Sequence, residues 1–166
     1  MSDMKYSFLV ALTATVMAVA TPSRAQVTPN AEDSVRTVLA ALFTGMKNAD
    51  AAAIRQAFTD SAILQFVGTD KDGNTSVKTT AIDDFLARIG SLGKGAADER
   101  IHIDGVRIDG PLALVWAPYS FYLKGNFNHC GLDTFQLIRT SKGWKVQYVM
   151  YTGRKDACPA GTPDAP

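Results

Sequence analysis

The chain has 166 residues, a formal net charge of +1 and two cysteines. So balanced a charge gives no electrostatic reason to expect nucleic acid or an anionic membrane as a partner. The length is that of one domain, and no internal repeat or linker divides it.

The start of the chain, residues 1–25, has the pattern of a secretory signal peptide. Lys5 supplies positive charge, residues 6–20 are apolar or neutral, and Ser23-Arg24-Ala25 offers the small residues that a signal peptidase recognises. The apolar run is shorter than the roughly 20 residues of a membrane span, although a membrane anchor or a core helix stays an alternative. We therefore expect cleavage after Ala25, a periplasmic or secreted protein, and no membrane association afterwards. A start at Met4 rather than Met1 would give a more ordinary leader.

Helical spacing of apolar residues predicts three helices. Asn30 can cap the first, whose apolar stripe then runs through Val35, Val38, Leu39, Leu42 and Phe43. The second helix covers 51–58, with Asp50 as its cap. The third opens at Thr80 or Ala81, and Gly93 stops it.

Strand patterns fill the rest of the chain. Two short strands, 62–68 and 75–79, flank a turn, and a further strand is expected at 100–109. Three long β-rich runs then follow between 112 and 151, with turns that make an antiparallel meander. Helices segregated from such a meander predict an α+β fold: a cone-shaped, curved antiparallel sheet with three helices on its concave face. Residues 26–158 would form this domain, and the Pro-rich tail 159–166 would be disordered.

Cys130 and Cys158 are predicted to form a disulfide, because export places them in an oxidising compartment. In the last hairpin Cys130 would lie opposite Arg154, and Cys158 follows soon after for a chain that curls back. Two free thiols are one alternative. A metal site using His129 with both cysteines is another, although it lacks a fourth ligand of recognisable spacing.

The element order resembles that of the nuclear transport factor 2-like (SnoaL-like) superfamily, which has an α+β cone fold. The segment 115–137, Val-Trp-Ala-Pro-Tyr-Ser-Phe-Tyr-Leu-Lys-Gly-Asn-Phe-Asn-His-Cys-Gly-Leu-Asp-Thr-Phe-Gln-Leu, is similar to the "putative lumazine-binding" group within it. Gly143-Trp144-Lys145-Val146 matches a strand start seen across the superfamily. Tyr151-Thr152-Gly153-Arg154 departs from the group, where an Asp often stands at the first of these positions. The superfamily includes isomerases, cyclases, dehydratases and non-catalytic binders, so the resemblance implies a fold and not one activity.

Strand alternation sorts the side chains of the meander into two faces. A turn centred on Lys142 would place Thr140 opposite Trp144, with Trp144 and Val146 under the helices. On that face, further from the turn, we expect a pocket for a planar ring; its candidate ligand-binding residues are Trp116, Thr134, Gln136, Tyr148 and Met150. Core packing is the alternative role for Trp116 and Tyr148. The other face carries a row of Tyr119, Asp133 and Tyr151, which we interpret as a hydrogen-bonded cluster facing solvent or a dimer partner.

Candidates for catalysis are few. His102 could form a proton-transferring pair with Asp60 or Asp104, although capping or ending the second helix is the simpler role for Asp60. The sequence contains no recognisable nucleophile arrangement, phosphate loop or metal motif, and Asp70-Lys-Asp-Gly-Asn74 lacks the Glu of a calcium loop. We therefore expect no metal and no cofactor.

Three functional hypotheses follow. The first is an exported protein that binds a small molecule, such as a planar heterocycle, in a cone pocket. The second is a cofactor-free enzyme of the isomerase or cyclase type that uses a His/Asp pair. The third is a non-catalytic interaction domain that forms a homodimer through its sheet.

Overall fold

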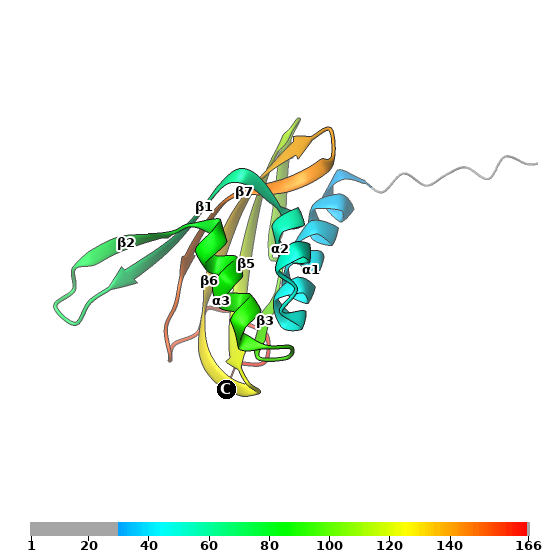
Figure 1. Ribbon diagram of the computed structural model, residues 1–166. Coiled ribbons are helices and arrows are strands. Elements are labelled where there is room, and N and C mark those ends of the chain that lie inside the picture. The colour runs from blue at the N-terminus through cyan, green and yellow to red at the C-terminus, as the bar shows by residue number, and fades with distance from the viewer. Residues whose placement is uncertain (1–29, 166) are drawn as a thin grey trace, which may run out of the picture.

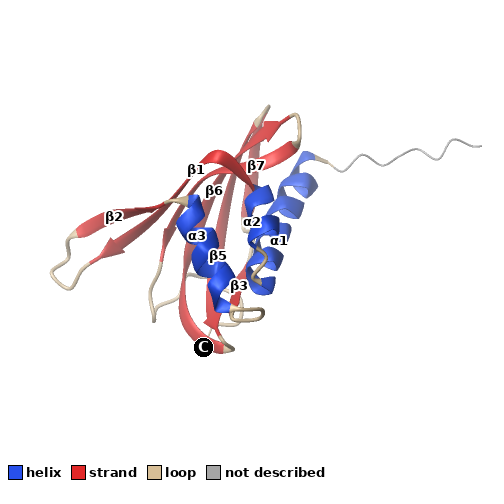
Figure 2. Ribbon diagram, viewed as in Figure 1, coloured by secondary structure: helices blue, strands red, loops and turns tan. Residues whose placement is uncertain are grey.

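The computed structural model describes residues 30–165, so the predicted signal peptide lies outside the described residues. Three helices, α1 (Ala31–Asn48), α2 (Ala51–Ala57) and α3 (Ile82–Leu92), lie along one side of a curved sheet (Figures 1 and 2). The strands in this part of the chain are β1 (Phe58–Thr69), β2 (Thr75–Thr80), β3 (Ala97–Ile101), β4 (Gly105–Asp109), β5 (Leu112–Leu123), β6 (Asn126–Thr140) and β7 (Gly143–Thr152). The predicted α+β cone fold is confirmed.

The sheet has the strand order β2-β1-β7-β6-β5-β3, and β4 also pairs with β5. All these neighbours are antiparallel except β1 and β7, which run parallel. The expected all-antiparallel sheet is therefore wrong at one pairing, because the β1–β2 hairpin joins the sheet beside the last strand of the meander. Figure 1 shows this hairpin projecting away from the rest of the molecule.

Local sequence signals set the helix starts. The Asn30 side chain accepts a hydrogen bond from the Asp33 backbone N–H at 2.8 Å, and Asp50 accepts one from Ala53 at 3.0 Å. The apolar stripes of the three helices then pack on the concave face of the sheet, where they form one hydrophobic core. In the part of the chain that the structure describes, no helix is long and apolar enough to span a membrane.

The strand expected at 100–109 is interrupted, so that it forms β3 and β4. The backbone N–H groups of His102 and Asp104 still bond to β5, at Pro118 O (2.9 Å) and Trp116 O (3.0 Å). Pro118 has no backbone N–H and so cannot donate a hydrogen bond back to this segment, which interrupts the pairing with β5 between the end of β3 and the start of β4.

A bulge in β7 decides which side chains face the helices. Near the turn Thr140 pairs with Gly143 and Leu137 with Val146, whereas Gln136 pairs with Tyr148. Gln147 is therefore an extra residue, and the predicted pairing of Thr140 with Trp144 is wrong by one position. Because successive side chains point to opposite faces, everything beyond Gln147 changes sides relative to the turn.

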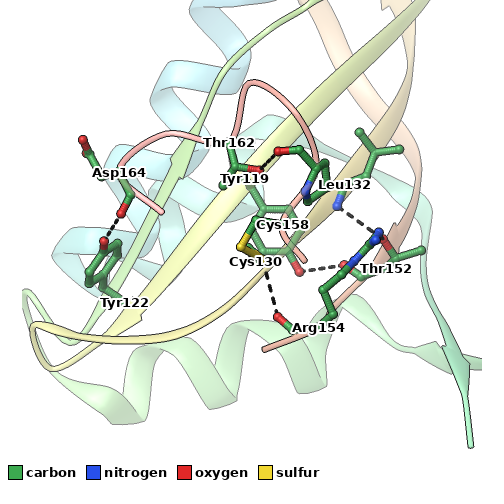
Figure 3. Close-up of a disulfide and its surroundings, with 10 residues drawn as sticks. Tyr119, Tyr122, Cys130, Leu132, Thr152, Arg154, Cys158, Thr162 and Asp164 are labelled. Carbon is green, nitrogen blue, oxygen red and sulfur yellow. Dashed lines mark hydrogen bonds between the residues drawn. A yellow bond between two sulfur atoms is a disulfide. The ribbon is translucent and has the colours of Figure 1, made fainter. Parts of the chain in front are cut away.

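Cys130 and Cys158 form the predicted disulfide, with their Cα atoms 5.6 Å apart. The expected position of Cys130 opposite Arg154 is also confirmed, by backbone hydrogen bonds of 2.8 Å in both directions. Figure 3 shows the bridge beside Thr152 and Arg154, where the chain leaves β7.

The C-terminal tail differs from the expected disordered segment over residues 159–165. Arg100 Nη1 contacts Asp164 Oδ2 at 3.0 Å, and the Tyr122 hydroxyl donates to the Asp164 carbonyl (Figure 3). The disulfide starts this segment beside β6, and these polar contacts then hold it against β3 and β5. Composition suggested disorder because the tail has little apolar surface, but charge and hydrogen bonds attach it instead.

Candidate functional site

A cavity of about 350 Å³ lies between the helices and the concave face of the sheet. Its walls are mostly aliphatic and aromatic side chains contributed by every layer of the fold: Leu42, Phe43, Met46, Phe58, Leu64, Phe85, Ile89, Leu92, Phe121, Leu123, Phe135 and Val149. Six polar or ionisable side chains complete the lining: Arg88, Glu99, Tyr119, His129, Asp133 and Tyr151. A largely apolar cavity with a few convergent polar groups is the usual form of a small-molecule site.

Two carboxyl groups form the most unusual feature of this cavity. Asp133 on β6 is only 4% exposed, and its side chain is hydrogen-bonded to that of Glu99 on β3. Glu99 retains some exposure, and it lines the cavity. Two carboxyl groups can bond to each other only when one of them carries a proton, which it donates to the other.

The surroundings of the pair explain why a proton is held there. Burial raises the pKa of Glu99 to about 7, against the smaller opposing effect of its hydrogen bond with Asp133. Burial also raises the pKa of Asp133 well above its ordinary value, and the negative charge of Glu99 raises it further. The pair therefore titrates as a unit, and it holds a proton in a range where isolated carboxyl groups are ionised.

Tyr119 lies beside the carboxyl pair, but its hydroxyl is hydrogen-bonded to a different group. Its hydroxyl donates to the Thr152 carbonyl at 2.8 Å (Figure 3), and its ring lies over Gly131. Burial raises the pKa of Tyr119, and the nearby charges of Glu99 and Asp133 add to this effect. Tyr119 is thus an uncharged side chain, held in place by its hydrogen bond, that lines the cavity next to the carboxyl pair.

Tyr151 and Arg88 lie on a different part of the lining. Arg88 on α3 is exposed, lies 5.8 Å from the Phe85 ring centroid and is close enough to Tyr151 to influence its pKa. Burial raises the pKa of Tyr151, whereas the positive charge of Arg88 opposes that rise. The cavity therefore has a cationic group at its exposed edge and acidic groups on the sheet.

His129 adds a third ionisable type. Burial lowers the pKa of its imidazole, whose ring packs edge-on against Tyr119 with centroids 5.6 Å apart and lies 5.1 Å from the Phe121 centroid. Its Nδ1 lies 2.8 Å from the Asn128 side-chain oxygen. A neutral imidazole packed between aromatic rings contributes an aromatic surface to the cavity and one polar ring edge.

The five residues predicted to bind a ligand lie on the face of the sheet that points away from the helices. Trp116 is 53% exposed, Gln136 is exposed, and Thr134, Tyr148 and Met150 are partly exposed. Trp116, Thr134 and Gln136, together with Asp104, line a second pocket of about 420 Å³ on the outer side of the sheet, which has neither the carboxyl pair nor most of the aromatic side chains of the first. The face prediction is wrong because of the β7 bulge, which brings Val149 and Tyr151 under the helices instead.

The same bulge corrects the interpretation of the row formed by Tyr119, Asp133 and Tyr151. These residues were expected to face solvent or a dimer partner, but all three line the cavity. Asp133 pairs with Tyr151 across β6 and β7, as the row requires.

The three catalytic candidates do not meet in the cavity. His102 Nε2 lies 3.4 Å from Asp104 Oδ1, but both side chains are exposed and neither lines the cavity. Asp60 is an exposed residue within β1, which starts at Phe58 directly after α2, so it does not end that helix. A His/Asp acid–base pair in the cavity is therefore not formed by these residues.

Sequence reasoning missed Glu99 and Arg88, and it considered His129 only for an alternative metal site with the two cysteines. Glu99 had a usable signal, because it alternates with Ala97 and Ile101 on one face of β3, which leaves an acid between inward-facing residues. Arg88 and His129 had none, since only packing brings them to the cavity. No cluster of possible metal ligands occurs in residues 30–165.

Comparisons with known proteins agree with this architecture. Residues 30–152 match the family model described as "Putative lumazine-binding". A comparison with curated proteins found no match.

Solved structures with the same fold come from several bacteria. An NTF2-like protein of unknown function from Shewanella baltica OS155 is 20% identical with a TM-score of 0.61, over 78% of this chain and 99% of that one. One from Methylobacillus flagellatus KT is 17% identical with a TM-score of 0.61, over 78% and 96%. A ketosteroid isomerase-like protein from Erwinia carotovora atroseptica SCRI1043 is 16% identical with a TM-score of 0.55, over 78% and 100%. At these identities the likeness shows the fold alone.

Proposed function

Since the chain belongs to the "Putative lumazine-binding" family of NTF2-like proteins, we propose that it is an exported protein that binds a small molecule in the cavity between the helices and the sheet. The cavity carries this proposal. Its volume of about 350 Å³ lies within the range of small-molecule sites, roughly 300–1,000 Å³.

The lining favours a planar ligand. Phe121, Phe135 and Tyr151 present aromatic rings from three strands, and Phe43 and Phe85 present rings from the helices opposite. Aromatic side chains bury large areas at small entropic cost and stack on flat rings. The polar groups on the sheet would then orient the edge of such a ring.

Lumazine itself is a suitable first probe, because it is planar and fluorescent. We expect saturable quenching of its fluorescence by the protein. Val149→Phe would fill part of the cavity and weaken binding about tenfold or more by overpacking. Met150→Phe is the matched control, since Met150 is the next residue of β7 and does not line the cavity. Equal weakening by both variants, or by neither, would place any lumazine site outside the cavity. Native mass spectrometry of the exported protein would detect a ligand that co-purifies.

A second candidate is a cofactor-free enzyme of the isomerase or cyclase type, and the Glu99–Asp133 pair is the observation that favours it. A carboxyl group that holds its proton near neutral pH can act as an acid, while its partner acts as a base. Exchange of the α-hydrogens of a bicyclic ketone, such as tetralone, for deuterium in heavy water tests this chemistry. Exchange that is faster than in buffer and lost in Glu99→Gln supports an enzyme, whereas a bound ketone that does not exchange supports a binding protein.

Export and self-association complete the proposal. Cleavage after Ala25 predicts a mature N-terminus at Gln26, which N-terminal sequencing of the exported protein would check. Dimerisation through the outer face of the sheet is supported by exposed apolar residues on β5, where Leu112, Leu114 and Trp116 are 42%, 45% and 53% exposed. Sedimentation should then show a dimer that Trp116→Glu converts to a monomer, and a wild-type monomer at all concentrations would contradict the dimer.

A further inference from the structure

Among residues 30–165, the carboxyl pair has no counter-ion. In the described part of the chain, no Lys, Arg or His makes a salt bridge with Glu99 or Asp133. Buried acids are normally paired with a cation or a set of donors, because an uncompensated charge is costly away from water. Each carboxyl of this pair instead has the other as its side-chain partner, inside a cavity large enough for a ligand.

The nearby polar groups do not fill this role. The Tyr119 hydroxyl donates to the Thr152 carbonyl, and Arg88 is exposed and lies near Tyr151. The free acceptor capacity of the cavity is therefore concentrated at the two carboxyl groups, whereas its positive charge lies apart from them.

From these observations we propose that Glu99 and Asp133 recognise the N–H donor edge of a planar cation, such as an amidinium, a guanidinium or a protonated amino-heterocycle. The inference rests on the proposed function, because the ring of this ligand would occupy the aromatic part of the same cavity. Two N–H groups diverging from one planar carbon match two adjacent carboxylates, and charge-assisted hydrogen bonds of this kind are the strong ones.

Binding would displace the proton that the two carboxyl groups share. With Glu99 ionised and Asp133 still protonated, the free pair carries one proton and one negative charge; the cation takes the place of that proton, which leaves to the buffer, and both carboxylates then accept from the ligand. About one proton should be released per cation bound to this state, and more at a lower pH where Glu99 also holds its proton, so the affinity for the cation should rise with pH.

The other titratable groups that face the pair contribute little to this release. Tyr119 on β5 and Tyr151 on β7 stay neutral because their pKa values are raised, and the partly buried imidazole of His129 on β6 stays neutral near pH 7 because its pKa is lowered. Arg88 is the one charged residue of α3 that lines the cavity, and its guanidinium is exposed.

Three naphthalene probes of the same shape test the inference: naphthamidine, acetylnaphthalene and naphthoate, each substituted at the same ring position. By isothermal titration calorimetry we expect the cationic amidine to bind about tenfold or more tightly than the neutral ketone, and the anionic naphthoate to bind most weakly. Titration of the amidine in phosphate and in Tris, which differ in ionisation enthalpy, measures the released proton.

Variants then assign the effect to the pair. Glu99→Gln and Asp133→Asn should lose both the preference for the amidine and the proton release, whereas the exposed Asp60→Asn keeps both. His129→Asn should also keep the proton release. If the first two variants do not fold, the wild-type titrations still decide.

The outcomes separate the two proposals. Equal binding of amidine and ketone, or amidine binding without proton release, would overturn the recognition of a cation and leave the binding cavity standing. Failure of all three naphthalenes to bind would overturn both, because the cavity would then not admit a planar bicyclic ring.

Discussion

The side chains of Glu99 and Asp133 are hydrogen-bonded although β5 separates their strands. Glu99 pairs with Phe121 of β5, and Asp133 pairs with Ala117 of the same strand, so the two carboxyl groups meet diagonally across the position of Tyr119. The Tyr119 ring lies instead over Gly131, a position without a side chain. This arrangement joins three strands at one point on the concave face and sets the chemistry of the cavity.

The carboxyl pair should make the protein less stable as the pH rises. The folded-state pKa of Glu99, about 7, lies above the ordinary value of 4.5, so between these values the unfolded chain has released a proton that the folded protein still binds. The contribution of Glu99 to stability is then fully present below about pH 4.5 and is lost as the pH rises through about 7, by on the order of 3 kcal/mol. Urea unfolding at about pH 5 and about pH 8 measures this loss, which Glu99→Gln should reduce and the exposed Asp60→Asn should not. A wild-type stability that rises over this range would contradict the raised pKa.

Gly131 should tolerate no side chain. A Cβ atom there would lie 2.0 Å from the Thr152 carbonyl oxygen and 2.8 Å from Cε1 of Tyr119. Gly131→Ala should therefore lower the free energy of unfolding by about 3 kcal/mol or more, because the backbone of β7 must move. Gly105→Ala is the matched control, since nothing lies within 4 Å of the Cβ added in β4. Similar denaturation midpoints for the two variants would argue against the close contact between β6 and β7.

Gln147 should matter more through its side-chain hydrogen bonds than as an inserted residue. Its amide NH₂ donates to the Ser61 carbonyl at 3.1 Å, and its amide oxygen accepts from the Thr59 hydroxyl at 2.8 Å. Gln147→Ala should cost about 1–2 kcal/mol through these bonds. Deletion of Gln147 would remove the bulge but leave Val149 and Tyr151 on the helix side, because Tyr148 would then follow Val146 in regular alternation, so we expect a cost similar to that of the substitution. Circular dichroism during urea unfolding compares the two, and a deletion that abolishes folding would show that β7 needs its bulge.

The disulfide should supply much of the stability. It closes a loop with a sequence separation of 28, which corresponds to about 3–4 kcal/mol in the chain-entropy model. Reduction of the wild type and the double variant Cys130→Ala/Cys158→Ala should therefore lower the denaturation midpoint to a similar extent. A reductant should have no effect on the double variant, which serves as its control. Two titratable thiols in oxidised, denatured wild type would rule out the bridge.

Several features could be predicted because they depend on neighbouring residues. The caps at Asn30 and Asp50 need only a side chain and a backbone N–H three residues away. The pairing of Cys130 with Arg154 depended on counting along one hairpin, and the count was correct at that end although it was wrong near the turn. The family also follows from the sequence, since a long segment of the meander carries its pattern.

The cavity could not be predicted in the same way. Alternation places Tyr119, Asp133 and Tyr151 in one row but does not say which side of the sheet that row faces. One extra residue in β7 reverses the answer, and the sequence contains no marker for it, because Gln147 is as compatible with a regular strand as with a bulge.

By itself the sequence determined the helices, the meander, the disulfide and the membership of a family, because short-range periodicity and spacing encode each of them. Only the tertiary structure decided which face of the sheet lines the cavity and that Glu99 meets Asp133 there. The physical reason is that a β-bulge and a contact between strands that are not neighbours depend on how the whole sheet curves against the helices. Packing across the core stabilises such contacts, and no local sequence pattern predicts them.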